Sequence, residues 1–250
     1  MTPEQLLTSW HAQQTAFIEF RDLRVRAMLE AIRALHVEEG LRVLDLGCGP
    51  GSLCDAVAEA FPEAEVVGID RDPILLRLGR ETNRHGERVQ LLDVDLTDPQ
   101  WTKQVGERKF DAVVSATALH WLSPDDLVRL YLSLPEVLNP GAVFLNADHL
   151  SYDSETQTFL REVSESDRER FRLSELERGV MTWEAWWDAA RSQPGWEAET
   201  QEWERRWKDK TAPVKVSLDF HLDALRTAGF AETGHIYRWF DDVVVFARLP

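Results

Sequence analysis

Cysteine is scarce in this sequence: Cys48 and Cys54 are the two cysteines among 250 residues. Their spacing matches no zinc-binding pattern, and a single pair does not make a disulfide framework. We interpret both as small buried residues of a chain that stays reduced. Residues 1–14 lack the charged and apolar regions of a secretory leader, and no apolar run approaches the roughly 18 residues of a membrane span. The sequence therefore predicts a cytoplasmic protein with no metal site and no membrane partner.

Basic residues are also in deficit. The chain has 28 lysines and arginines against 44 aspartates and glutamates, which gives a net charge of −16 with histidine neutral. The acidic groups are spread along the whole chain, so no basic segment is hidden by the average. Nucleic-acid backbones require clustered lysine and arginine. The charge balance therefore predicts that nucleic acid is not a partner.

Tryptophan, in contrast, is abundant. The chain has ten, of which six lie within residues 183–207. Helical spacing relates four positions of this stretch: Trp183, Trp186, Trp187 and Ala190. Because disordered linkers are poor in aromatic residues, we interpret the polar, Trp-rich residues 151–213 as a helical insertion. Its indoles either face a substrate or anchor the insertion on the main domain or on a second subunit.

Strand and helix patterns alternate on both sides of this insertion. Short apolar stretches predict strands at residues 43–46, 66–69, 89–92, 110–115 and 142–146. Helical patterns lie between them, which indicates a parallel sheet covered on both faces. After the insertion, residues 218–227 read as a helix that Ser217 caps. Two strands then follow at 235–240 and 243–249, and their short connection makes them antiparallel.

A glycine-rich turn lies between the first strand and the next helix, where residues 43–51 read VLDLGCGPG. Glycines let a ligand approach the backbone closely. A pyrophosphate cradle is disfavoured, because Pro50 removes a backbone donor and Asp45 places a carboxylate at the strand end. The spacing of the glycines also disfavours a nicotinamide oxidoreductase. Asp45 suits a ligand with a cationic amino group instead.

Two further aspartates end neighbouring strands. Asp70 follows Gly51 by 19 residues, where an acidic side chain can accept hydrogen bonds from both ribose hydroxyls. Asp95 follows the third strand, where it could accept from an adenine amino group. Together with the glycine turn, they describe a site for a nucleoside with a cationic amino-acid tail.

These motifs, together with FDAVVSATALHWL at residues 110–122, resemble those of class I S-adenosylmethionine-dependent methyltransferases. The resemblance covers about residues 41–150 and 217–249, and its ALHWL resembles the small-molecule branch, including enzymes similar to trans-aconitate methyltransferase. It implies a doubly wound α/β sandwich of three layers and seven strands, six parallel and one antiparallel, with the insertion as a helical cap. Four segments are expected: an N-terminal helical segment covering the site (1–40), the cofactor-binding core (41–150), the insertion (151–213), and a C-terminal helix and hairpin (214–250).

The resemblance also implies which residues bind the methyl donor. They are Asp45, Gly47, Gly49, Gly51, Asp70, Arg71, Asp95 and Leu96. The glycines would wrap the methionine part, and Arg71 would pack on the adenine. Asp93 is a rival for Asp95, which we prefer because it lies six residues after Val89.

Methyl transfer needs mainly alignment of the nucleophile, the methyl and the leaving sulfur, with a base if the nucleophile is an amine or a phenol. His120 is the candidate for that base, or else packs its loop. We interpret Asp148 and His149 as ordinary polar residues of a loop. Arg21 and Arg24 either are exposed on their helix or meet a carboxylate of the donor or substrate.

The sequence thus predicts a methyltransferase that uses S-adenosylmethionine, yields S-adenosylhomocysteine, and acts by in-line transfer to oxygen, nitrogen or carbon of a small molecule. A monomer and a homodimer are both compatible with it. The alternative is a non-catalytic S-adenosylmethionine-binding partner or regulatory protein. Nucleic-acid amino methylation is disfavoured, because residues 115–118 read SATA where such enzymes resemble D/N-P-P-Y/F.

Overall fold

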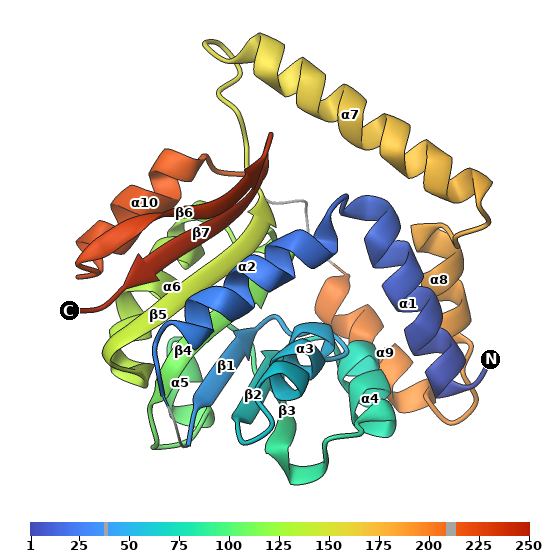
Figure 1. Ribbon diagram of the computed structural model, residues 1–250. Helices are drawn as coiled ribbons and strands as arrows, with labels where there is room; N and C mark the ends of the chain where they lie inside the picture. Colours follow the sequence, from blue (N-terminus) through green and yellow to red (C-terminus); the bar gives the residue numbers. More distant parts are fainter. Residues whose placement is uncertain (38–39, 209–213) are drawn as a thin grey trace.

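A seven-stranded sheet forms the centre of the protein in a computed structural model that describes residues 1–37, 40–208 and 214–250 (Figure 1). The strands are β1 Arg42–Leu46, β2 Glu65–Asp70, β3 Val89–Asp93, β4 Phe110–Ala116, β5 Leu138–His149, β6 Glu232–Trp239 and β7 Asp242–Arg248. Their order is β3-β2-β1-β4-β5-β7-β6, and β7 runs antiparallel to both of its neighbours. The prediction of six parallel strands and one antiparallel strand is confirmed.

Helices cover both faces of this sheet, while α1, α7, α8 and α9 pack mainly against other helices. The helices are α1 Pro3–Phe17, α2 Arg21–Arg33, α3 Ser52–Ala60, α4 Pro73–Thr82, α5 Trp101–Gln104, α6 Pro124–Val137, α7 Thr158–Glu177, α8 Trp183–Arg191, α9 Glu197–Trp207 and α10 Leu218–Thr227, with short 3₁₀ turns η1 Gly86–Arg88 and η2 Leu119–Trp121. One buried core joins the sheet to α6 and α10, and another joins it to α2 and α3. β1, β2 and β4 are largely buried on both sides, as their apolar runs predict, whereas the edge strand β6 is largely exposed. None of the helices in the described residues is long and apolar enough to cross a membrane.

The strand order determines where a ligand site forms. β1 lies between β2 and β4, so the chain leaves β1 toward one edge of the sheet and later returns to its other side. Ligands of open α/β sheets bind beyond the carboxyl ends of the strands at such a reversal. The glycine turn of residues 47–51 follows β1 at this point.

Local capping explains several helix starts. Asp72 accepts hydrogen bonds from the N–H groups of Ile74 and Leu75 at the start of α4, and Ser217 accepts from Phe220 N–H at the start of α10, as predicted. These side chains satisfy donors that the first helical turn leaves unpaired.

Two local features differ from the sequence-based expectation. The N-terminal helical segment is interrupted after Phe17, where Phe20 takes a left-handed conformation and α2 begins. Residues 139–141, which precede the strand predicted at 142–146, lie inside β5, where the pairing with β4 shifts register. Residues 38–39 and 209–213, at the ends of two predicted segments, lie outside the described residues.

The Trp-rich stretch forms helices, as its periodicity predicts. α8 packs beside α1 (Figure 1). The buried Trp186 donates a hydrogen bond from Nε1 to the Leu6 carbonyl at 3.2 Å, and its ring lies 4.7 Å from that of Trp10. An indole thus anchors α8 to the N-terminal helix.

Candidate functional site

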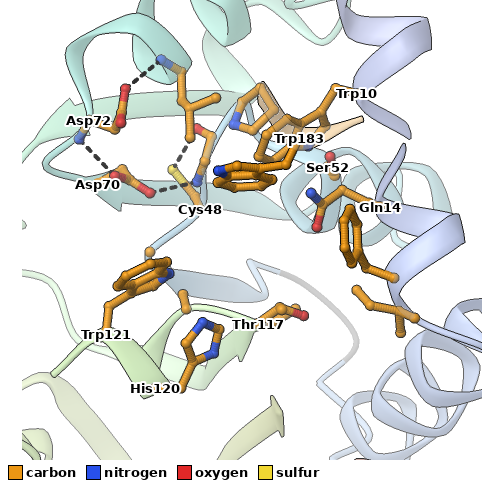
Figure 2. Close-up of a pocket in the computed structure, with 18 of the residues that line it drawn as sticks. Trp10, Gln14, Cys48, Ser52, Asp70, Asp72, Thr117, His120, Trp121 and Trp183 are labelled. Atoms are coloured by element: carbon orange, nitrogen blue, oxygen red, sulfur yellow. Dashed lines mark hydrogen bonds between the residues drawn. The ribbon is translucent and has the colours of Figure 1, made fainter. Parts of the chain in front are cut away.

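A cavity of about 980 Å³ lies at the carboxyl ends of β1 and β4 (Figure 2). Its lining comes from the β1–α3 turn, from α1 and α2, from the residues after β4 and β5, and from α7, α8 and α9. Small-molecule sites measure roughly 300–1,000 Å³, so this cavity has room for two ligands of metabolite size.

The glycine turn forms one wall of the cavity. Gly47 and Cys48 donate backbone hydrogen bonds to the carbonyl of Ile69 at 2.8 and 3.0 Å, which ties the turn to β2. Gly47 has a φ of +69°, and a Cβ at this position would lie 2.4 Å from the Cβ of Ala118. A side chain therefore has neither the conformation nor the space it needs at Gly47.

Asp45 presents an unused acceptor to this wall. The residue is 1% exposed and lines the cavity. One carboxyl oxygen accepts a hydrogen bond from Cys54 Sγ at 3.3 Å, and the other has no partner among the described residues. Burial raises the pKa of Asp45 to about 7, and the charge of Asp70 adds to the effect. A buried carboxylate in this state is stabilised by an incoming cationic or N–H group.

Asp70 is held in place by backbone donors. Its two carboxyl oxygens accept from Gly49 N–H at 2.7 Å and from Asp72 N–H at 2.8 Å, one on each oxygen (Figure 2). Burial raises its pKa, although these backbone hydrogen bonds oppose the shift. Each carboxylate oxygen keeps further lone pairs, so Asp70 has capacity for two ligand hydroxyls on the cavity side.

The residues predicted to contact adenine lie elsewhere. Arg71, Asp95 and Leu96 are not among the described residues that line the cavity. Arg71 forms a 2.9 Å ion pair with Asp95 and stacks on the ring of Trp207 at 5.6 Å. Asp95 also accepts from the N–H and hydroxyl of Thr97, and Leu96 packs against the sheet core.

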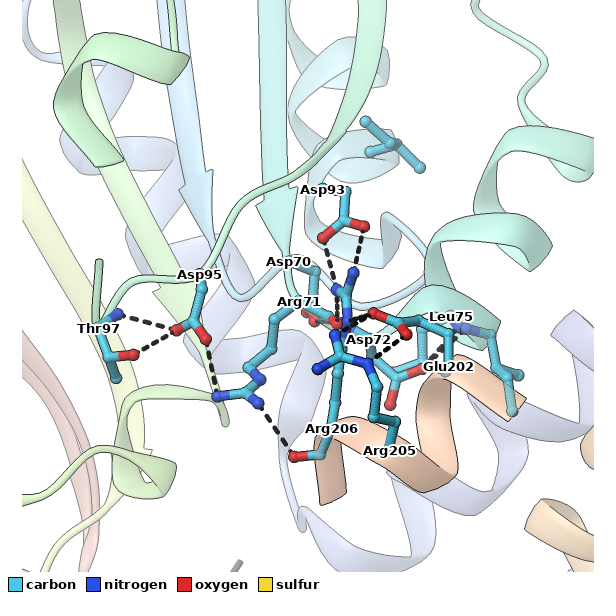
Figure 3. A network of polar contacts seen from close by, with 12 residues as sticks. Asp70, Arg71, Asp72, Leu75, Asp93, Asp95, Thr97, Glu202, Arg205 and Arg206 are labelled. Atoms are coloured by element: carbon cyan, nitrogen blue, oxygen red, sulfur yellow. Dashed lines mark hydrogen bonds and ion pairs between the residues drawn. The ribbon is translucent and has the colours of Figure 1, made fainter. Parts of the chain in front are cut away.

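The end of α9 covers these residues (Figure 3). Arg206 binds both carboxylate oxygens of Asp93 at 2.6 and 2.8 Å and donates to the carbonyl of Arg71 at 2.6 Å. Arg71 returns a hydrogen bond to the carbonyl of Arg206 at 3.1 Å. The rival aspartate Asp93 thus anchors a helix, while Asp95 holds Arg71.

His120 lies across the cavity from the glycine turn (Figure 2). Asp148 orients its ring. Its Nδ1 is 2.7 Å from one Asp148 oxygen, and its backbone N–H donates to the other at 3.1 Å. Burial would raise the pKa of Asp148, but the charge and hydrogen bond of His120 outweigh it and lower the pKa to about 2. The ionised Asp148 accepts the Nδ1 proton, so Nε2 is the basic nitrogen of the ring.

Sequence reasoning missed the roles of Asp148 and Arg24. Asp148 is 1% exposed and not part of a polar loop. Arg24, also 1% exposed, pairs with Asp242 at 2.7 Å and donates to the hydroxyl of Thr117. The partners are 28 residues apart for Asp148 and His120 and 218 apart for Arg24 and Asp242, so no local pattern reveals them.

Comparisons with known proteins agree with this geometry. A sequence profile described as a methyltransferase domain matches residues 43–141. This segment is a class I methyltransferase domain. S-adenosylmethionine is the methyl donor of the class. The methyltransferase domain begins in β1 and ends in β5, so it contains the glycine turn, Asp70 and His120.

Curated relatives match over part of their length. The trans-aconitate 2-methyltransferase of Azoarcus sp. (strain BH72) is 28% identical over 156 residues, which are 62% of this chain and 57% of that enzyme. The corresponding enzyme of Methylobacterium radiotolerans is 34% identical over 128 residues, 51% of this chain and 45% of its own length. The chain thus spans less than two thirds of these relatives.

Solved structures share the methyltransferase fold. An S-adenosylmethionine-dependent methyltransferase from Mesorhizobium loti superposes with a TM-score of 0.53 at 21% identity, covering 89% of this chain and 97% of its own. PigF, solved with S-adenosylhomocysteine, gives a TM-score of 0.54 at 14% identity and covers 89% of this chain and 54% of its own.

Proposed function

We propose that this protein transfers a methyl group from S-adenosylmethionine to a small molecule. The unpartnered oxygen of Asp45 supports the proposal most directly, because a buried acceptor at the glycine turn suits the ammonium of an amino-acid tail. Asp70, at the end of β2 beside the glycine turn, suits ribose hydroxyls. When bound, the donor supplies a methyl group already activated on a sulfonium.

The methyltransferase domain would hold the donor through the residues that the resemblance assigns. Asp45 binds the amino group, Gly47 and Gly49 let the methionine part approach the backbone, and Asp70 binds the ribose. Gly51, with a φ of +88°, turns the chain into α3. On the adenine side, the assigned residues are Arg71, Asp95 and Leu96.

The proposed organisation keeps the four segments at residues 1–40, 41–150, 151–213 and 214–250. In it, α7, α8 and α9 form a cap over the core. The support is that each of these helices contributes side chains to the cavity wall. Because a cap excludes water, it strengthens electrostatic contacts in the site.

His120 is the proposed base for an acceptor that must lose a proton. Asp148 fixes the ring through Nδ1, which leaves Nε2 to take the proton. The open cavity beside His120 favours an enzyme over a non-catalytic binding protein, since a binder needs no room for an acceptor.

Calorimetric titration with S-adenosylhomocysteine tests the donor site. We expect the native chain to bind, and both Asp45→Asn and Asp70→Asn to weaken binding by about tenfold or more. Asp188→Asn removes an exposed carboxyl of α8 whose side chain is 73% exposed, and should leave binding unchanged. Absence of binding by the native chain at millimolar ligand contradicts the proposal.

A labelled-methyl assay tests the base. His120→Gln should lower turnover of a proton-losing acceptor by about 10²–10⁴-fold, while affinity for S-adenosylhomocysteine stays unchanged. Asp148→Asn should move the pH profile of turnover, because it alters which ring nitrogen carries the proton. Equal turnover in the His120 variant would remove the histidine from the mechanism.

A further inference from the structure

The cavity has a basic region that the donor does not explain. Beyond the glycine turn its lining includes Arg21, Arg24, Arg168, Arg172, Arg191 and Lys215. The acidic lining residues Asp45, Asp70 and Asp72 belong to the donor side, and Glu184 is the one further carboxyl among the described lining residues. A chain with a net charge of −16 thus gathers positive charge in one cavity.

Most of these cations are already paired within the chain. Arg24 pairs with Asp242, and Arg168 pairs with Asp241. Arg172 and Arg191 pair with carboxylates one turn away on their own helices. Among the described residues, Arg21 and Lys215 form no ion pair, and their charges remain available to a ligand. Lys215 is exposed, so an incoming ligand can reach it.

Several cations of this region act on their titratable neighbours. Burial lowers the pKa of His149 to about 3, and the charges of Arg24, Arg168 and Lys215 add to the effect. Burial also lowers the pKa of Arg21, as does the charge of Arg24. Each group destabilises a further positive charge beside it, and a bound anion relieves this.

An apolar wall adjoins the basic region. Phe17 of α1 meets Trp183 of α8 edge to face, with ring centroids 6.4 Å apart and planes at 88°. Trp183 in turn contacts Trp187 at 5.7 Å, and both indoles line the cavity with Leu176. Flat aromatic faces recognise planar apolar groups.

We infer that the acceptor is a hydroxylated aromatic carboxylate, whose ring lies against Trp183 and whose carboxylate binds in the basic region, where Arg21 and Lys215 are the cations without an ion pair among the described residues. The inference rests on the proposed function and names its substrate class. The carboxylate serves as the anchor and a ring hydroxyl as the nucleophile. A carboxylate needs no base, whereas the cavity holds a histidine oriented by a buried aspartate.

The transfer balances without another reactant. The hydroxyl oxygen forms a bond to the methyl carbon, and the carbon–sulfur bond breaks with its electron pair remaining on sulfur. The hydroxyl proton passes to Nε2 of His120. The products are an aryl methyl ether that keeps its carboxylate and the neutral thioether S-adenosylhomocysteine.

Titration of the full chain saturated with S-adenosylhomocysteine tests the anchor. The probes are 4-hydroxycinnamate, its methyl ester and trans-aconitate. We expect the acid to bind at least about tenfold tighter than the ester. Arg21→Gln and Lys215→Gln should each remove most of that preference and leave the affinity for the ester unchanged. Arg26→Gln is the matched control, because Arg26 is exposed on the same helix as Arg21 and does not line the cavity.

Three outcomes overturn the inference: equal affinity for acid and ester, equal loss in the Arg26 variant, or tighter binding of trans-aconitate than of the aromatic acid. With labelled methyl donor, a ring ether as product supports the assignment of the hydroxyl, and a methyl ester overturns it. Failure to bind S-adenosylhomocysteine would instead refute the proposed function, so the two failures are distinguishable.

Discussion

At Gly47 the glycine turn packs so closely against the segment after β4 that no side chain fits. Gly47→Ala places a methyl group 2.4 Å from Ala118 at a φ of +69°, so the turn or the segment after β4 must move. We expect affinity for S-adenosylhomocysteine to fall by about tenfold or more, measured by calorimetry. Gly86→Ala is the control: its φ is +59°, but a Cβ there meets nothing within 4 Å. Equal binding by both variants would show that the contact with Ala118 is immaterial.

Asp45 predicts a pH dependence. Its pKa of about 7 in the folded chain lies above the ordinary value of about 3.9. Burial favours the protonated carboxyl, so the folded state loses stability relative to the unfolded state as the pH rises through the folded pKa of about 7. A bound ammonium offsets this loss because it stabilises the carboxylate. Affinity for S-adenosylhomocysteine should increase several-fold from about pH 5.5 to 7.5. Titrations across this range should show a much flatter profile for Asp45→Asn; an unchanged slope would assign the effect to another group.

The residues that sequence could predict are those whose chemistry is local. Gly47 and Asp45 belong to one strand and turn, so their spacing alone indicates a ligand site. Asp148 and Arg24 depend on partners brought together by the fold. Their neighbours in sequence give no sign of burial, so the sequence indicates a polar loop residue for Asp148 and leaves Arg24 either exposed or in contact with a ligand carboxylate.

Among the elements, strands and amphipathic helices were the most predictable. Apolar runs located β1 to β4, and indole spacing located α8. The break between α1 and α2 was not predicted, because Phe20 adopts its left-handed conformation without glycine. Nor does the sequence indicate that α9 meets the end of β3, since Arg206 and Asp93 are 113 residues apart.

The contact of α9 with β2 and β3 yields a prediction of its own. Arg206→Gln removes the bidentate pair with Asp93 and loosens the helix end over Arg71. We expect S-adenosylhomocysteine to dissociate about 3–10-fold faster, since a charge-assisted pair on a partly exposed surface contributes about 1 kcal/mol. Stopped-flow tryptophan fluorescence can follow this. In the Arg205→Gln variant, which loses an ion pair with Glu202 on the same helix, the ligand should dissociate at the native rate. Matching rates in both variants would show that the pair of Arg206 with Asp93 does not retain the ligand.

At the scale of the whole molecule, charge is separated between surface and cavity. The net charge of −16 repels an anionic acceptor, and salt screens this repulsion as the Debye length falls from about 30 Å at 0.01 M to about 8 Å at 0.15 M. The association rate of 4-hydroxycinnamate should therefore rise several-fold over this range, as stopped-flow mixing can measure. Its neutral methyl ester should show no such change. A rate that falls with salt would mean that the basic cavity steers the ligand instead.

The hydrogen bond from Trp186 to Leu6 joins residues 180 positions apart, and this has a consequence for the order of assembly. α1 can pack against α8 only after residues 183–191 have been synthesised. Contacts between distant parts of a chain form late, because closing a long loop costs entropy. The first five strands of the sheet can thus form before α1 and α8 complete the wall of the cavity. The cavity then becomes able to hold a ligand only near the end of folding.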